Sequence, residues 1–256
     1  MIFLAGCGRT DAPAGGAAGG ELLVAAAQSL QGAVEVGAEA FRARHPGVRI
    51  VWTYGASGVL ARQIDAGAPI DILLSASARE MDWAEQRGLI FADSRRVLAR
   101  NRLVLIAAES VSTGTLGSWE DLRRESVGRV ALGDPRTVPA GQYADEVLRR
   151  LGLREAITGK VVYGANVRQV LDYVARGEVA AGVVYASDVR VARRPVRVVA
   201  EAPAGTHSPI EYPMAVVRRS SRPELAREFL DVLGSPGVQA SLEKAGFLAG
   251  GEGENR

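Results

Sequence analysis

Cysteine and histidine are scarce in this chain of 256 residues, which has one cysteine, Cys7, and two histidines, His45 and His207. A single cysteine cannot form an internal disulfide or supply a cysteine-based zinc cluster. The histidines lie in proline-containing segments without a partner suited to a metal site or a serine triad. The glycine-rich dinucleotide fingerprint and the Gly-x-x-x-x-Gly-Lys-[Ser/Thr] phosphate loop are also missing. These absences argue against a metalloenzyme, a serine hydrolase and a nucleotide-binding protein.

Long apolar runs and an excess of one charge are absent too. Residues 103–108 form a typical apolar run of strand length, well below the roughly 20 residues of a membrane-spanning helix. The 31 basic and 29 acidic residues leave a net charge of +2, and the arginines are scattered, so no nucleic-acid partner is expected. With 47% hydrophobic and 23% charged residues, the composition is that of a globular protein with one large or two ordinary domains.

From Glu21 onward, short aliphatic runs alternate with amphipathic segments, a pattern typical of parallel sheets flanked by helices. Strands are predicted at 22–26, 48–54, 70–75, 103–107, 130–133, 160–163, 180–185, 196–199 and 212–217. Apolar residues spaced by three and four predict helices at 30–44, 59–66, 78–87, 144–151, 167–176, 223–233 and 236–245. The expected fold class is therefore α/β.

The junction at residues 133–141 combines small residues with a proline where a helix should begin. Pro139 cannot donate a hydrogen bond, and Ala140 and Gly141 leave the first free N–H groups of the helix uncovered. Such a helix start attracts anions, because its free N–H groups and the helix dipole act in the same direction. Similar junctions recur at 26–29 and 55–58, and in looser form at 164–167. We expect these junctions to converge on one small anion.

Segments in a specific order carry a family resemblance between about Glu21 and Phe247. They are residues 25–30, 56–64, 67–71, 133–135, 138–141, 182–188 and 211–213. Together they resemble the molybdate-binding proteins of bacterial ABC transporters. The resemblance implies a two-lobed periplasmic-binding-protein fold, in which each lobe has a mostly parallel sheet flanked by helices. It implies a first lobe at 21–101 and 207–256, a second lobe at 102–206, and crossings near 101–105 and 204–210, with the ligand in the cleft.

In that family the oxyanion is held by backbone N–H groups and hydroxyls, and the matching positions here are Ser29, Ser57, Ala140, Val167 and Tyr185. The chemistry of these residues agrees, since a fully deprotonated oxyanion only accepts hydrogen bonds and these groups donate them. Three or four helix starts, each with roughly half a positive charge, would offset on the order of 1.5 to 2 negative charges. A protonated oxyanion would bring a hydrogen that finds no acceptor. No cofactor, resident metal or catalytic residue is expected; molybdenum would enter only as the bound oxyanion.

Simpler roles for the same residues stay open at this point. Ser29 and Ser57 could be helix N-caps, the common role of serine before an apolar run. Tyr185 could be a tyrosine at the edge of the core with a hydrated hydroxyl. Asn166 could cap the helix that begins at Val167 without contacting any ligand.

Residues 4–7, Leu-Ala-Gly-Cys, resemble the bacterial lipobox, in which the leader is cut before a cysteine that is then acylated. A Gly/Ala-rich segment follows at 8–20 and suits a flexible tether. Six residues before Cys7 are too few for a signal peptide, so this interpretation expects the natural start further upstream. The alternative is a chance cysteine in an N-terminal tail.

These observations predict a periplasmic or cell-envelope binding protein, monomeric and lipid-anchored at Cys7, that meets the membrane only through that anchor. Its ligand would be molybdate or tungstate, and its partner the permease of an ABC importer. Two alternatives remain: a binding protein for sulfate or a phosphate species, and a cytoplasmic regulator or enzyme on the same fold.

Overall fold

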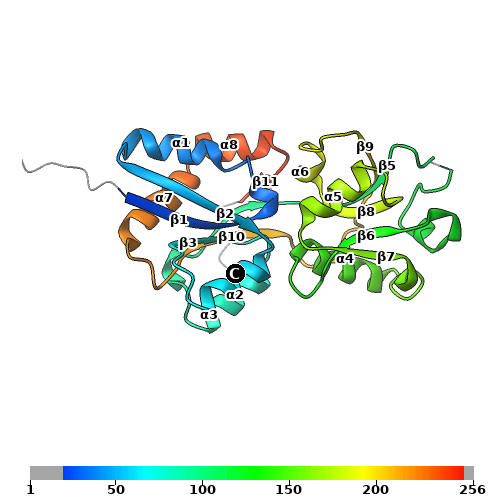
Figure 1. The fold of residues 1–256 in the computed structure, drawn as a ribbon, viewed down its shortest axis with the longest axis horizontal. Helices are drawn as coiled ribbons and strands as arrows, with labels where there is room; N and C mark the ends of the chain where they lie inside the picture. Colours follow the sequence, from blue (N-terminus) through cyan, green and yellow to red (C-terminus); the bar gives the residue numbers. More distant parts are fainter. Residues whose placement is uncertain (1–19, 113, 251–256) are drawn as a thin grey trace, which may run out of the picture.

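The computed structural model describes residues 20–112 and 114–250, which form two lobes side by side along the long axis of the molecule (Figure 1). Each lobe is built on its own β-sheet. The predicted two-lobed α/β fold is therefore confirmed. Cys7, most of the predicted tether and the tail at 251–256 lie outside the described residues.

The first lobe contains a six-stranded sheet in the order β11-β4-β10-β3-β1-β2. Its strands are β1 (Gly20–Ala27), β2 (Val48–Gly55), β3 (Ile72–Leu74), β4 (Arg96–Arg100), β10 (Glu211–Val216) and β11 (Leu248–Ala249). Its helices are α1 (Glu35–Arg44), α2 (Ser57–Asp65), α3 (Ala78–Gln86), α7 (Pro223–Leu233) and α8 (Pro236–Lys244). Successive side chains of β1 enter different cores: Val24 joins the cluster of Phe41 and Phe229, and Ala25 joins that of Leu60 and Met81. Both faces of the sheet are thus covered.

The second lobe contains a five-stranded sheet in the order β7-β6-β8-β5-β9. Its strands are β5 (Leu103–Ala108), β6 (Val130–Gly133), β7 (Val161–Gly164), β8 (Ala181–Tyr185) and β9 (Val196–Glu201). Its helices are α4 (Pro139–Arg150), α5 (Val167–Ala175) and the short α6 (Ala186–Val189). Helices α4 and α5 both pack against β6 and β8, the central strands of this sheet.

Most strands of each sheet run in one direction, and the exceptions follow from the path of the chain. In the first sheet β10 and β11 are reversed, and in the second β5 is reversed. Strands β5 and β10 each begin where the chain has just crossed from the other lobe, so they run away from the cleft. Strands such as β1, β2 and β6 instead end at the cleft, where loops and helix starts meet a ligand.

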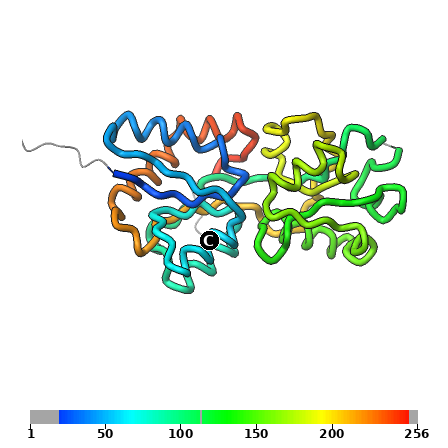
Figure 2. Tube along the Cα trace, in the orientation of Figure 1, coloured from blue at the N-terminus to red at the C-terminus, as the bar shows by residue number. Residues whose placement is uncertain are grey.

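Two short segments connect the lobes, as Figure 2 shows. Asn101 and Arg102 link β4 to β5, and residues 202–210 link β9 to β10. The segments are hydrogen-bonded to each other at their ends, from the Asn101 N–H to the Ile210 carbonyl at 3.1 Å. The first crossing is shorter than the predicted 101–105, because Leu103 already pairs with Tyr185 in the second sheet.

Helix boundaries differ from prediction mainly at the cleft. The helix predicted at 30–44 is a 3-10 turn (Gln28–Leu30) followed by α1, because Gly32 adopts a φ of 87° that no regular helix allows. Helix α4 begins at Pro139, as the junction at 133–141 predicts, whereas the apolar spacing indicated a helix only from residue 144. Strands β4 and β11 were not predicted; β4 carries arginine at both ends, and β11 has only two residues.

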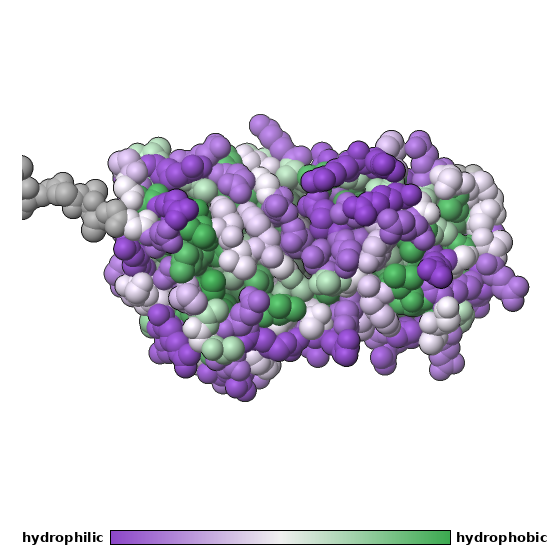
Figure 3. Space-filling model, in the orientation of Figure 1, coloured by the Kyte–Doolittle hydropathy of each residue, from purple (hydrophilic) through white to green (hydrophobic). Residues whose placement is uncertain are grey.

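Hydrophilic residues cover most of the face seen in Figure 3, and apolar residues there form separate patches. Within the described residues, no helix has the length and apolar character that crossing a bilayer requires.

The two lobes contact each other directly across the cleft. The Gly58 N–H donates to the Thr137 carbonyl at 3.1 Å, and the Gln142 amide donates to Glu80 at 2.8 Å. A Cβ at Gly58 would lie 2.9 Å from the Thr137 carbonyl oxygen, so glycine permits this approach. The structure therefore shows the lobes in a closed arrangement.

Glycine is required where β6 meets α4, and this contact can be tested. A Cβ at Gly141 would lie 2.0 Å from the Gly133 carbonyl oxygen, a clash with backbone. Gly141→Ala should lower the free energy of unfolding by about 1 to 3 kcal/mol. For a chain of this size, that corresponds to roughly 2 to 4 °C in Tm per kcal/mol.

Gly237→Ala is the matched control, because Gly237 also lies in the first turn of a helix but has nothing within 4 Å of its would-be Cβ. It should leave the Tm unchanged or raise it. Equal effects of the two substitutions in thermal unfolding would contradict the close approach of β6 and α4.

Candidate functional site

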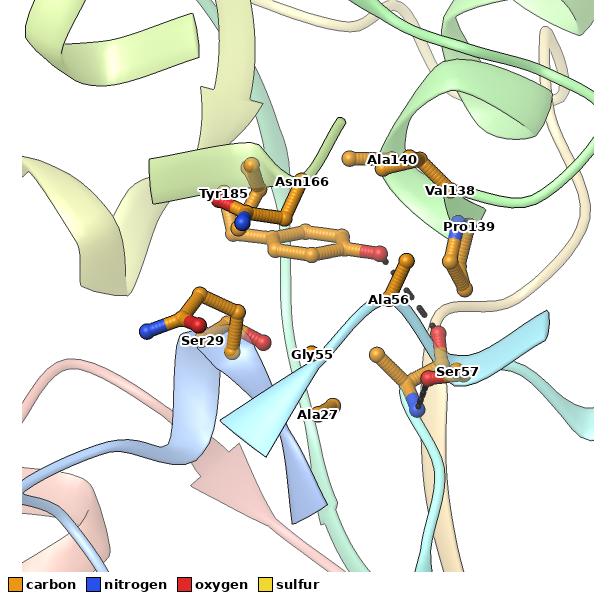
Figure 4. A pocket seen from close by; sticks show the side chains of 13 residues that line it. Ala27, Ser29, Gly55, Ala56, Ser57, Val138, Pro139, Ala140, Asn166 and Tyr185 are labelled. Carbon is orange, nitrogen blue, oxygen red and sulfur yellow. Dashed lines mark hydrogen bonds between the residues drawn. The ribbon is translucent and has the colours of Figure 1, made fainter. Parts of the chain in front are cut away.

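A small pocket lies in the cleft between the lobes, with about 210 Å³ of empty space between its lining atoms. It is lined by Ala27, Gln28, Ser29, Gly55, Ala56, Ser57 and Ala76 of the first lobe and by Val138, Pro139, Ala140, Asn166, Val167 and Tyr185 of the second. The structure thus brings all five predicted site residues to one place (Figure 4).

Three helix starts meet at this pocket, and they supply backbone donors. Ser57, Pro139 and Val167 are the first residues of α2, α4 and α5. The N–H groups of Ser57, Ala140 and Val167 have no acceptor among the described residues. Because the dipoles of the three helices place partial positive charge at the same point, the pocket favours an anion.

Ser57 is held by a backbone donor from the neighbouring strand end. Its hydroxyl accepts a hydrogen bond from the Ala76 N–H at 2.9 Å, and its side chain is buried. Residue 56 occupies the N-cap position of α2, and no side-chain capping bond is present there. The N-cap role considered for Ser57 is therefore wrong. Since its oxygen already accepts a bond, the hydroxyl hydrogen of Ser57 is free to be donated into the pocket.

Ser29 lies in the 3-10 turn after β1, and its hydroxyl lies 3.0 Å from that of Tyr212. No side-chain capping bond is present at this turn, so the N-cap role is also wrong for Ser29. Tyr212 is fully buried and receives a hydrogen bond from the Asn101 amide at 3.3 Å. Ser29 is thus tied to the segment that connects the lobes.

Tyr185 ends β8 and reaches from the second lobe toward the first (Figure 4). Its side chain is 1% exposed, and its hydroxyl donates to the Ala76 carbonyl at 3.5 Å. That distance is at the limit of a hydrogen bond, so the hydroxyl can turn to a stronger acceptor. Burial raises the pKa of Tyr185 well above its usual value of 10.0, so the hydroxyl keeps its proton.

Ala140 and Val167 contribute backbone rather than side-chain chemistry, because their side chains carry no polar atoms. Asn166 caps α5, and its side chain accepts a hydrogen bond from the Gln169 N–H at 3.0 Å. The predicted capping role of Asn166 is confirmed. Since it also lines the pocket, the cap orients the helix start at the site.

Charged side chains are absent from the described lining of the pocket. Outside this lining, partly exposed Arg168 and fully buried Asp188 form an ion pair with a nitrogen-to-oxygen distance of 3.9 Å. Burial raises the pKa of Asp188 to about 6, and the cation of Arg168 opposes that rise. Across the described chain, no cluster of His, Cys, Asp and Glu could hold a metal ion.

Three residues around the site were not predicted from the sequence: Ala76, Asn101 and Tyr212. The motif at 211–213 pointed to the region of Tyr212, but no local pattern indicated that its hydroxyl reaches Ser29 across 183 positions. Ala76 follows a three-residue strand and acts through its backbone. Pairings at such separations come only from the fold.

A pocket of donors between two α/β lobes joined by two crossings defines a solute-binding protein. The chain belongs to the family of bacterial extracellular solute-binding proteins, whose family model matches residues 22–248. Its members bind solutes for transport and are not enzymes.

Known proteins resemble this chain over nearly its whole length. A putative ABC transporter substrate-binding lipoprotein, YvgL of Bacillus subtilis, is 36% identical over 97% of this chain and 94% of its own length. The molybdate-binding protein ModA of Escherichia coli is 36% identical over 96% of this chain and 97% of its own. A solved substrate-binding domain of a putative molybdenum ABC transporter from Clostridium difficile has a TM-score of 0.67 and 36% identity, covering 90% of this chain and 98% of that one.

The two hydroxyls that approach Ala76 should differ in their effect on stability without ligand. Ser57→Ala leaves the buried Ala76 N–H without its acceptor, which should cost about 1 to 3 kcal/mol of unfolding free energy. Tyr185→Phe removes only a bond at the limiting distance, so its effect should stay within about 0.5 kcal/mol. Chemical denaturation of the ligand-free variants measures both values, and a larger loss for Tyr185→Phe would contradict these hydrogen-bond assignments.

Proposed function

We propose that this protein captures molybdate, and also tungstate, for an ABC importer. The observation that carries the proposal is the composition of the pocket. Unpaired N–H groups from three helix starts and the hydroxyls of Ser29, Ser57 and Tyr185 line it, and no charged side chain is among its described residues. Such a lining suits a small ligand that accepts hydrogen bonds on every side.

The donors also support a choice between oxyanions. A tetrahedral oxyanion without a proton can be met by donors alone, whereas a protonated one places a hydrogen against N–H and O–H groups. This disfavours phosphate, which keeps a proton at neutral pH. Sulfate carries no proton there, so size has to separate it from molybdate.

The relatives support the choice of molybdate and the partner. ModA of Escherichia coli is named for molybdate binding, and the Clostridium difficile domain is described as part of a putative molybdenum ABC transporter. The partner would be the permease of such a transporter. Binding would close the lobes over the anion, and the contacts between Gly58 and Thr137 and between Gln142 and Glu80 would then hold the closed form that the permease recognises.

Ligand binding is tested by thermal unfolding with sodium molybdate, tungstate, sulfate and phosphate in parallel. A ligand at a thousandfold excess over its Kd stabilises the native state by about 4 kcal/mol. For a protein of this size, molybdate and tungstate should therefore raise the Tm by roughly 8 to 16 °C. A shift with sulfate or phosphate and none with molybdate would assign the protein to another oxyanion.

Calorimetric titration of Tyr185→Phe with molybdate tests whether the ligand binds in this pocket. Losing one hydroxyl donor to a charged ligand should raise the Kd for molybdate about ten- to a hundredfold. Tyr163→Phe is the matched control, because Tyr163 is an exposed tyrosine of the second lobe that lies outside the pocket lining. Unchanged affinity in Tyr185→Phe would exclude this hydroxyl as a ligand group.

Attachment to the membrane through Cys7 is the second part of the proposal. The lipobox-like segment at 4–7 supports it, and so does the name of the Bacillus subtilis relative, which is described as a lipoprotein. Expressed in its own host with its natural leader, the protein should partition with membranes and carry acyl mass on Cys7. Cys7→Ala should abolish both properties, and a wild-type protein with a free thiol in the soluble fraction would contradict the anchor.

A further inference from the structure

A chain of hydrogen bonds runs from the first crossing segment into the pocket. The Asn101 amide nitrogen lies 3.3 Å from the Tyr212 hydroxyl, which lies 3.0 Å from the Ser29 hydroxyl. All three side chains are buried, with exposed fractions of 7%, 0% and 6%. Buried hydroxyls cannot exchange these partners for water, so the direction of each bond is set by the groups present.

The first link can run in only one direction. The Asn101 side-chain oxygen accepts from the Arg102 N–H at 2.9 Å, and a backbone N–H can only donate. The amide nitrogen must therefore face the other way, where it donates to Tyr212 and, at 2.8 Å, to Ser187. A flipped amide would set two donors against each other. Tyr212 is thus an acceptor from Asn101.

The second link follows from the first. The oxygen of Tyr212 accepts from Asn101, and its hydrogen has one acceptor among the described residues, the Ser29 hydroxyl oxygen. The opposite direction would leave a buried Tyr212 hydrogen unpaired, at a cost in free energy. Ser29 therefore accepts from Tyr212 and has its own hydrogen left for the pocket.

Ser57 reaches the same state by a different route. Its oxygen accepts from the Ala76 N–H, so its hydrogen is also left for a ligand in the pocket. The two serines differ in what holds them: Ser57 depends on backbone, while Ser29 depends on two side chains that substitutions can change.

We propose that Asn101 and Tyr212 are positioning residues that fix Ser29 as a hydrogen-bond donor and so set the preference of the pocket for oxyanions without a proton. This inference rests on the proposed oxyanion-binding function and adds which residues make the Ser29 hydroxyl a donor. Asn101 also bonds to Ser187, which lies in α6 directly after Tyr185 and Ala186. This chain of hydrogen bonds from Asn101 through Tyr212 to Ser29, called the relay below, therefore begins at a side chain that contacts both lobes.

Two substitutions act on the relay in different ways. Tyr212→Phe removes the donor to Ser29, so the serine hydroxyl becomes free to accept as well as donate. Asn101→Asp keeps the shape and the bond from Arg102 but replaces the donor by an acceptor, which reverses the chain and presents a lone pair of Ser29 to the pocket. We expect a rise in the Kd for molybdate of about tenfold for Tyr212→Phe and more for Asn101→Asp.

The affinity for phosphate distinguishes donor control from general damage to the site. Phosphate carries a proton that the freed Ser29 oxygen can accept, so its affinity should stay constant or rise in Tyr212→Phe. In Asn101→Asp the added carboxylate repels both anions, so there the ratio of their Kd values is the diagnostic quantity. The ratio of phosphate to molybdate Kd, measured by calorimetry at neutral pH, should fall at least about tenfold. Equal weakening for both anions would overturn the proposal. Tyr54→Phe is the control, since the Tyr54 hydroxyl of the same lobe bonds to Glu35 instead.

A double-mutant cycle with Ser29→Ala tests whether the relay acts through that serine. Tyr212→Phe should weaken molybdate binding in the wild-type background and have no further effect in Ser29→Ala. The same fold-change in both backgrounds would overturn the relay and leave the oxyanion function intact. Failure of the wild-type protein to bind molybdate would instead contradict the proposed function. Thermal unfolding without ligand identifies any variant that fails to fold. If one of Asn101→Asp and Tyr212→Phe does not fold, the comparison of phosphate with molybdate can be made on the other.

Discussion

The structure depends on one constraint: the pocket must attract an anion with the partial charges of helix starts, because no charged side chain is among its described lining residues. The three helix starts at Ser57, Pro139 and Val167 can do so only if they meet at one point. Two of them belong to one lobe and one to the other, so neither lobe holds the site alone. The close contact of Gly58 with Thr137, and of Gly141 with Gly133, brings the backbone segments near enough.

The topology of both sheets brings these helix starts to one place. Strands β1, β2, β6 and β7 end at the cleft and lead into the 3-10 turn or a helix that lines the pocket, whereas β5 and β10, which start from a crossing, run the other way. The two crossings are joined by the hydrogen bond from the Asn101 N–H to the Ile210 carbonyl. The same segments carry Asn101, so the part of the chain that connects the lobes also contacts the groups that orient a pocket hydroxyl.

The direction of the hydrogen bonds made by the serine hydroxyls also determines which ligands the pocket suits. A serine hydroxyl can donate or accept, and its neighbours decide which. Around Ser57 and Ser29 those neighbours are donors, the Ala76 N–H and the Tyr212 hydroxyl. Burial then fixes the result, because water cannot replace a partner. Arg168 and Asp188 form an ion pair outside the pocket lining, and no charged side chain is among the described lining residues.

The sequence by itself determined the alternation of strands and helices, the helix starts and five of the residues that line the pocket, because propensity, capping and family motifs are local. It did not reveal β4 or the Gly32 interruption before α1, since charged strand ends and single-residue conformations leave weak local signals. Only the tertiary structure decided which serine meets which donor. The bonds of Ser29 with Tyr212 and of Asn101 with Ser187 join residues 183 and 86 positions apart, and burial after folding gives them their direction.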